Sequence, residues 1–436
     1  MAPTVRALRA RAGRAVRGRP HLRPPNRAFA RLFVLLAFLG PGLIAANAGN
    51  DAGGVATYSA VGARYGYDLL WMMVVITVSL IVVQEMAARM GIVTGKGLAE
   101  LIREQYGPRW SLFSTVSVLF ANLGICISEF VGIGAALGLA HVPPQVSVPI
   151  AAVVVWLLVV RGSYKVAERV FVAMTIPFFA YPIAAVLAHP KWSAVGHAIV
   201  APHIQLTSPY LILFVATAGT TITPFMQLYL QSAVVERGLG PEDLPAERAE
   251  VITGSLFANI VAGFIIIATG ATLYVHGDHT VNSAADAARA LAPFAGRFAE
   301  LLFGIGLLGA SLLAAAILPV TAAHVIAETF GLEKGISRRP REAPVFVGVI
   351  TVLIAIGAAV AMVPGLPVIK LLVLVQVVNG ALLPVTLFFV WRLARNVELM
   401  GEYKNGRIFD LLAGLTVVAT SGLSIVLLVV TLTGNA

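Results

Sequence analysis

The chain has 436 residues, of which 58% are hydrophobic and only 12% are charged, and its mean hydropathy is +0.88. A soluble protein of this size needs more charge to cover its surface, so the composition excludes an ordinary soluble domain and predicts a surface that faces lipid. The net charge of +10 is divided among short segments between apolar runs, which argues against a nucleic-acid-binding face. The single cysteine, Cys126, excludes an intramolecular disulfide and a cysteine-based metal site.

Long apolar runs alternate with short polar gaps, and each run is near or above the ~20 residues needed to cross the hydrocarbon of a bilayer. The sequence therefore predicts an all-α polytopic membrane protein. We predict eleven transmembrane helices, at residues 32–63, 68–90, 111–140, 145–163, 167–188, 208–236, 250–275, 298–328, 344–363, 367–394 and 407–432.

The positive charges fall mainly on one side of these predicted spans. Of the 31 Lys and Arg residues, only Arg64, Lys191, Arg289, Arg297 and Lys370 lie in segments on the other side. The positive-inside rule then predicts a cytoplasmic N-terminus and an external C-terminus in the cell membrane. The basic segments could also bind anionic lipid headgroups.

Residues 1–31 carry nine arginines and no acidic residue, a composition shared with organelle transit peptides. Pro20, Pro24 and Pro25 would break an amphipathic helix in this segment. We therefore predict a disordered, basic cytoplasmic tail.

Two predicted spans are interrupted near mid-depth by Gly, Pro and polar residues. The first contains Gly40-Pro41-Gly42 and the stretch 46–54, and the sixth contains the stretch 216–224. Interruptions of this kind leave backbone polar groups that a cavity or a ligand must satisfy, although Gly and Pro can also simply bend a helix. If spans 1–5 and 6–10 form two halves, the breaks occupy matching positions, which is typical of transporter binding sites.

This match predicts two inverted repeats, because an odd number of spans per half reverses the orientation of the second half. The first repeat covers residues 32–188 and the second covers residues 208–394. A further helix at 407–432 follows them.

Asp51 is the first acidic residue of the chain and lies within the first break. A lone carboxylate near the bilayer centre costs about 2.5–3.5 kcal/mol on insertion scales, so it needs a partner. Asp51 could cap the helix that follows the break. No Lys or Arg lies nearby in this span, and a bound cation would compensate the charge better than a cap alone.

Oxygen donors from both breaks, with two amides from the middle of span 10, form the predicted metal site. Such hard ligands suit Mg²⁺, Ca²⁺ or Mn²⁺ better than later transition metals. The glycines at 49, 53, 54 and 219 would leave room for a partly hydrated ion. Hydrogen bonding between helices is an equally good interpretation of the span 10 amides. The candidate residues are Asp51, Asn50, Gly54, Thr220, Thr221, Thr223, Gln376 and Asn379.

Other polar residues are expected along the pathway or at helix ends. Glu129 is a second intramembrane acid, and Gln227 shares a helix face with Gln231 after the second break, so we place Glu129 and Gln227 on the pathway. Glu85 with Arg89, and His324 with Glu328, are spaced i, i+4 and are predicted to form local pairs at helix ends.

These motifs resemble those of the NRAMP divalent-metal transporters. The similarity covers essentially the whole membrane region, and its motifs are Gly40-Pro41-Gly42, Asp51-Ala52-Gly53-Gly54, Ser128-Glu129-Phe130, Leu228-Tyr229-Leu230-Gln231-Ser232 and Gln376. The resemblance implies a LeuT-like fold of two inverted five-helix repeats, with the ion at the breaks of helices 1 and 6. An enzyme has the least support, because no nucleophile–base pair, metalloprotease motif or phosphate-binding loop appears in the sequence, and we expect no cofactor besides the transported ion.

The departures from the NRAMP pattern bear on the choice of metal. The family reads Asp-Pro-Gly-Asn in its first helix, where this chain has Asp51-Ala52-Gly53-Gly54, and Met-Pro-His in its sixth, where this chain has Thr223-Pro224-Phe225. A second register places Met226 opposite the family's His, but neither register retains the Met. Cys126 stands where the family has an acid before Glu129.

The two break motifs instead look like those of the divergent NRAMP-related magnesium transporters. That resemblance implies import of Mg²⁺ and Mn²⁺ through a wider, harder site, with weak or no proton coupling. The alternative is a proton-coupled Mn²⁺/Fe²⁺ transporter of the NRAMP type. A sodium-coupled amino-acid transporter fits less well, because Asp51 would repel a substrate carboxylate, and a channel or receptor would not need paired breaks. Besides the metal ion and the bilayer, nothing in the sequence indicates a nucleic-acid or obligate protein partner.

Overall fold

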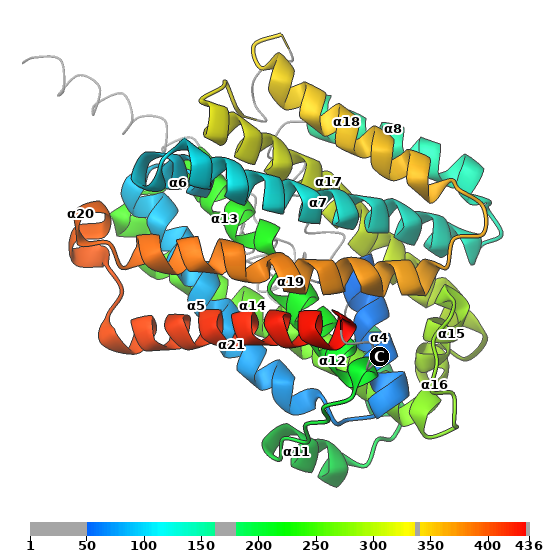
Figure 1. Ribbon diagram of the computed structural model, residues 1–436. Helices are drawn as coiled ribbons and strands as arrows, with labels where there is room; N and C mark the ends of the chain where they lie inside the picture. The colour runs from blue at the N-terminus through cyan, green and yellow to red at the C-terminus, as the bar shows by residue number, and fades with distance from the viewer. Residues whose placement is uncertain (1–49, 162–179, 336–340, 433–436) are drawn as a thin grey trace, which may run out of the picture. The chain divides into compact units, whose positions relative to one another are not determined.

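The computed structural model describes residues 50–161, 180–335 and 341–432 (Figure 1), and this part of the chain is helical, without β-strands. The longer helices are α4 (Ala52–Tyr65), α5 (Leu70–Thr94), α7 (Pro108–Gly138), α8 (Pro144–Arg161), α12 (Ser208–Thr221), α13 (Pro224–Glu236), α14 (Leu244–Thr269), α17 (Ala299–Phe330), α18 (Pro344–Ala361), α19 (Val368–Ala394) and α21 (Arg407–Leu432). Shorter elements connect them: α6 (Leu98–Tyr106), α10 (Ala180–Leu187), α11 (Trp192–Val200), η3 (Pro241–Asp243), η4 (Gly270–Tyr274), α15 (Ala284–Ala288), η5 (Arg289–Leu291), α16 (Ala292–Ala295), η6 (Gly296–Phe298), α20 (Val397–Met400) and η7 (Gly401–Tyr403).

Nine membrane-length apolar segments lie within these described residues. They coincide with predicted spans 2–4 and 6–11, so the prediction of an all-α, multi-pass membrane protein is confirmed. Predicted spans 1 and 5 lie partly outside the described residues. Their described parts are α4 and α10. The total of eleven spans therefore stays a prediction.

The break in the sixth predicted span falls between α12 and α13. Proline has no backbone N–H and disfavours helical geometry in the residue before it, so Pro224 starts a new helix and Thr223 is extended (φ −74°, ψ 143°). In the first span, α4 begins at Ala52, directly after Asp51. Residues 40–49, which carry the rest of that predicted break, lie outside the described part.

Helices of the predicted first half contact their counterparts in the second half. α4 contacts α12, α5 contacts α14, α7 contacts α17, and α8 contacts α18. In Figure 1 α8 lies beside α18 and α7 runs close to α17. Two repeats related by a pseudo-two-fold axis can produce such pairing, and the assignment of residues 32–188 and 208–394 to inverted repeats stays a prediction.

Small residues allow the helices to touch through their backbones, as is typical of helix packing in membranes. A Cβ atom added to Gly62 of α4 would overlap the Thr269 hydroxyl and lie 2.5 Å from the Ile266 carbonyl oxygen of α14. A Cβ atom on Gly380 of α19 would lie 2.5 Å from the Val215 carbonyl oxygen of α12. The backbones of α4 and α12 are thereby held close to α14 and α19.

We predict that Gly62→Ala lowers the free energy of unfolding by about 1–3 kcal/mol, because the added methyl must displace the backbone of α14. Gly348→Ala on α18 is the matched control, since nothing lies within 4 Å of its Cβ position. Thermal unfolding in detergent measures both variants. Equal midpoints for the two variants would contradict the close approach of α4 and α14.

Candidate metal site

Asp51 caps the N-terminus of α4. The Gly54 backbone N–H donates to Asp51 Oδ1 over 2.5 Å, and the residue is only 1% exposed. A carboxylate at this position accepts an otherwise unpaired backbone donor and faces the positive end of the helix dipole. The capping role that the sequence left open for Asp51 is therefore confirmed, and it uses only part of the carboxylate's capacity.

Two amides of α19 continue from this carboxylate. Gln376 Nε2 donates to Asp51 Oδ1 (3.1 Å) and Oδ2 (3.3 Å), and Gln376 Oε1 accepts from Asn379 Nδ2 (2.8 Å). Both amides are fully buried, and Asn379 Oδ1 has no hydrogen-bond partner. The predicted hydrogen bonding between helices is therefore confirmed for Gln376. The side-chain oxygen of Asn379 remains available for a ligand.

Glu129 brings a second acid to the same helix end. Its Oε2 accepts from the Ala52 backbone N–H (3.2 Å), and its Oε1 accepts from the Ser128 hydroxyl (3.1 Å). No ion pair within the described residues involves Asp51 or Glu129. Two buried carboxylates thus share one helix N-terminus and are neutralised by no Lys or Arg in this part of the chain, which makes the site attractive to a cation.

Hydroxyl groups from the break between α12 and α13 are buried as well. The Thr221 hydroxyl donates to the Thr217 carbonyl (2.7 Å) and is hydrogen-bonded to the Tyr58 hydroxyl (2.8 Å). Thr220 and Thr223 are fully buried, and the Thr223 hydroxyl has no partner. The break therefore offers one hydroxyl that nothing in the described structure satisfies.

Tyr58 is the site residue that the sequence analysis missed. It lies on α4, is 1% exposed, and joins this helix to the break through Thr221. The available signal was its spacing, because a residue seven positions after Asp51 lies on the same helix face.

Three predicted site residues have local roles. Asn50 Nδ2 donates to the Ala258 carbonyl of α14 (3.0 Å), so this side chain turns from the carboxylate toward α14. Gly54 contributes its backbone N–H to the Asp51 cap. The Gln227 amide lies against its own helix start, and the orientation that satisfies it turns its nitrogen toward the Thr223 (2.6 Å) and Pro224 (3.0 Å) carbonyls.

The expectation that glycines leave room for a hydrated ion is wrong for Gly53 and Gly219 in this structure. A Cβ atom on Gly53 would overlap the Gln376 side chain, and one on Gly219 would lie 2.7 Å from Gly380 Cα. These glycines permit close contact of α4 and α12 with α19, and the neighbouring helix fills the space.

One of the two predicted helix-end pairs is also wrong. His324 lies 3.8 Å from Glu236, while Glu328 binds Lys334 (3.1 Å) and the Ser232 hydroxyl (3.0 Å). The partners come from other segments, which i, i+4 spacing cannot reveal.

The Glu85–Arg89 pair is confirmed at 3.0 Å, and Arg248 joins it at 2.8 Å.

A helix that breaks at Pro224 and another that starts at a buried acid, within a multi-pass bundle, are typical of the architecture of secondary transporters. The structure matches the Eremococcus coleocola manganese transporter solved in complex with an aromatic bis-isothiourea compound. The TM-score is 0.72 at 21% identity, over 93% of this chain and 88% of that one. It also matches MhsT in complex with L-phenylalanine, with a TM-score of 0.58 at 15% identity, over 90% of this chain and 97% of that one. The LeuT-like fold is thereby confirmed.

The sequence defines the family. Residues 42–430 match the profile of Nramp, described as natural resistance-associated macrophage protein-like. The divalent metal cation transporter MntH of Ralstonia nicotianae is 31% identical over 407 residues, covering 87% of each chain. This chain belongs to the Nramp family, as its motifs predicted, and is a membrane transporter, not an enzyme.

We predict that Glu129→Gln unfolds close to wild type, because its amide oxygen can still accept from the Ala52 N–H. Glu129→Ala removes the acceptor and leaves a buried donor unpaired, which costs about 1–3 kcal/mol. Thermal unfolding of both variants in detergent tests this assignment. If the two variants lose the same stability, Glu129 does not support the start of α4 through that hydrogen bond.

Proposed function

We propose that this protein imports divalent metal ions, Mg²⁺ and also Mn²⁺, with weak or no proton coupling. The observation that carries the proposal is the buried Asp51 carboxylate, which has Glu129 beside it and no cationic partner among the described residues. The metal class is supported by the names of the relatives, which are a divalent metal cation transporter and a manganese transporter.

The proposed ligands are oxygen atoms around the two helix breaks. Thr223 Oγ1 and Asn379 Oδ1 are buried and unpartnered, so binding a cation would satisfy both. The Gln376 amide currently presents its nitrogen to Asp51, and a rotation would present its oxygen to the ion. Asn50 would take part through its main-chain oxygen, Gly54 would act indirectly through the N–H that it donates to Asp51, and Glu129 and Gln227 would flank the path. The remaining proposed metal ligands are Asp51, Thr220 and Thr221.

The choice of a hard cation follows from the side chains beside Pro224. Thr223 precedes it and Phe225 follows, so neither sulfur nor imidazole is adjacent to the break. Met226 Sδ is fully buried and lies 3.9 Å from Gln84 Nε2 of α5. Without a thioether ligand the site loses the softness that favours later transition metals.

Proton-coupled Mn²⁺/Fe²⁺ transport is the second candidate. Glu129 favours it, because a buried acid hydrogen-bonded beside Asp51 is a group through which protons could pass. Two further residues of the family's pattern are missing in this chain. Cys126 replaces an acid before Glu129, and the histidine of the sixth helix is absent. We rank this candidate below uncoupled import.

The proposed orientation follows the positive-inside rule. The protein would lie in the cell membrane with its N-terminus cytoplasmic and its C-terminus external. Residues 32–188 and 208–394 would form the two repeats. A divalent ion moving inward across 100 mV gains about 4.6 kcal/mol, twice the value for one charge, so uptake needs no second ion.

We predict that Asp51→Asn lowers Mg²⁺ and Mn²⁺ uptake into proteoliposomes by at least ~10–100-fold, the loss typical of outer-shell changes at metal sites. Asparagine is a good N-cap, so this variant keeps the start of α4 while it removes the charge. Asp68→Asn is the matched control, because Asp68 lies in a loop and faces the exposed His203 (3.0 Å). Uptake should be scanned with Mg²⁺, Mn²⁺ and Ca²⁺, and wild-type rates in Asp51→Asn would refute the site.

We further predict that wild-type proteoliposomes take up Mg²⁺ when the interior is negative, without acidification of the interior. The reason is that the membrane potential acts on the ion's two charges and no proton needs to accompany them. A trapped pH-sensitive dye measures proton entry while metal uptake is recorded. Proton entry that depends on metal would instead support the second candidate.

A further inference from the structure

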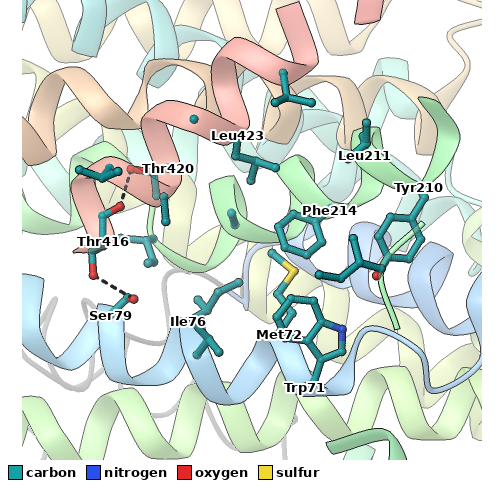
Figure 2. Close-up of a pocket in the computed structure, with 18 of the residues that line it drawn as sticks. Trp71, Met72, Ile76, Ser79, Tyr210, Leu211, Phe214, Thr416, Thr420 and Leu423 are labelled. Atoms are coloured by element: carbon teal, nitrogen blue, oxygen red, sulfur yellow. Dashed lines mark hydrogen bonds between the residues drawn. The ribbon is translucent and has the colours of Figure 1, made fainter. Parts of the chain in front are cut away.

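An apolar crevice lies between α5, α12 and α21, and its lining contains none of the proposed metal ligands. Its volume is about 360 Å³, and Figure 2 shows Trp71, Met72 and Ile76 of α5 facing Phe214 of α12 and Leu423 of α21 across it. Nothing in the proposed transport cycle uses this space.

The lining of the crevice is almost wholly apolar, and its unpartnered polar atom among the described residues is the indole nitrogen of Trp71, at the aromatic end. Its described lining contains no Asp, Glu, Lys, Arg or His. The hydroxyls at one end are already satisfied, since Thr416 donates to Ser79 (3.0 Å) and Thr420 donates to the Thr416 carbonyl (2.8 Å), as drawn in Figure 2. A ligand of this crevice must therefore be hydrocarbon along most of its length.

The crevice is continuous with the surface that faces lipid. Residues at its rim are strongly exposed although they are apolar: Val75 is 56% exposed, Leu206 81% and Val418 67%. In a membrane-spanning bundle the medium at such a rim is the acyl chains of the bilayer. The occupant with access to this space is therefore a lipid chain.

Aromatic side chains mark one end of the crevice. The ring centroids of Trp71 and Phe214 are 5.7 Å apart, those of Tyr210 and Phe214 are 6.1 Å apart, and those of Tyr65 and Tyr210 are 5.2 Å apart. Trp and Tyr gather where the hydrocarbon meets the headgroups. This end therefore corresponds to the glycerol level of a bound lipid, and the Ser79–Thr416 end lies deeper.

We propose that this crevice binds one acyl chain of a membrane phospholipid, with its headgroup end beside Trp71 and Tyr210. The chain packs against Ala218 and Ile222, which line the crevice. Ala218 is in the last turn of α12, and Ile222 is the first residue of the break, so the bound chain packs against the end of α12 where the helix breaks. Binding itself does not depend on the proposed metal transport, and only its effect on transport does.

Gly422 provides a selective test, because it lines the crevice and nothing lies within 4 Å of its Cβ position. Gly422→Leu should fill the crevice without overpacking. Gly348→Leu on α18 adds the same side chain at another open position, outside the crevice, and is the matched control. A background that keeps Trp71 as its only tryptophan, with Trp110, Trp156, Trp192 and Trp391 changed to Phe, makes the crevice visible by fluorescence.

These variants are reconstituted into phosphatidylcholine vesicles whose acyl chains carry bromine, which quenches tryptophan on contact. We expect strong quenching of Trp71 in the unfilled crevice and in Gly348→Leu, and loss of that quenching in Gly422→Leu. Equal quenching in all three proteins would overturn the proposal, as would absence of quenching in the unfilled crevice, the result expected if a second copy covered it.

A second measurement uses the chain with its tryptophans unchanged, in case the single-tryptophan background folds poorly. Mass spectrometry of the purified protein after mild delipidation counts the phospholipid retained. Wild type and Gly348→Leu should retain one more phospholipid than Gly422→Leu, and equal retention would overturn the proposal. Neither readout requires metal uptake, so failure here is distinguishable from failure of the transport proposal.

Discussion

The structure around the helix breaks depends on one buried carboxylate at the start of α4. Asp51 accepts the Gly54 N–H and both contacts from Gln376, so it fixes where α4 begins and how α19 lies against it. A carboxylate at this depth is tolerated only while donors or a cation surround it. Gly53 allows Gln376 to approach Asp51 closely, whereas Glu129 adds a second carboxylate beside it and so increases the need for a cation.

Much of this arrangement could be predicted from the sequence. Helix spans were readable because lipid-exposed helices must be apolar over a fixed length, and the second break because Pro224 cannot continue a helix. The capping role of Asp51 and an interhelical hydrogen bond from Gln376 were both among the interpretations of the sequence, since a buried charge must find partners, but the sequence did not pair these two residues.

The errors concern contacts between segments far apart in the chain. The missing side chains of Gly53 and Gly219 suggested empty space beside them, whereas α19 fills it. The i, i+4 spacing paired His324 with Glu328, whereas His324 faces Glu236, and Glu328 binds Lys334 and Ser232. Tyr58 was missed because a tyrosine in an apolar helix is ordinary until its hydroxyl is seen next to Thr221. Such features depend on which helices meet, and local patterns do not encode this.

The hydrogen bonds from Gln376 to Asp51 join residues 325 positions apart and couple α4 to α19. A cation that coordinated the Asp51 oxygens would replace these hydrogen bonds, and Gln376 would then have to turn its amide oxygen toward the ion. Ion binding would thus change the contact between α4 and α19. The side chain that hydrogen-bonds to Asp51 in the empty protein would then couple ion binding to the position of these two helices.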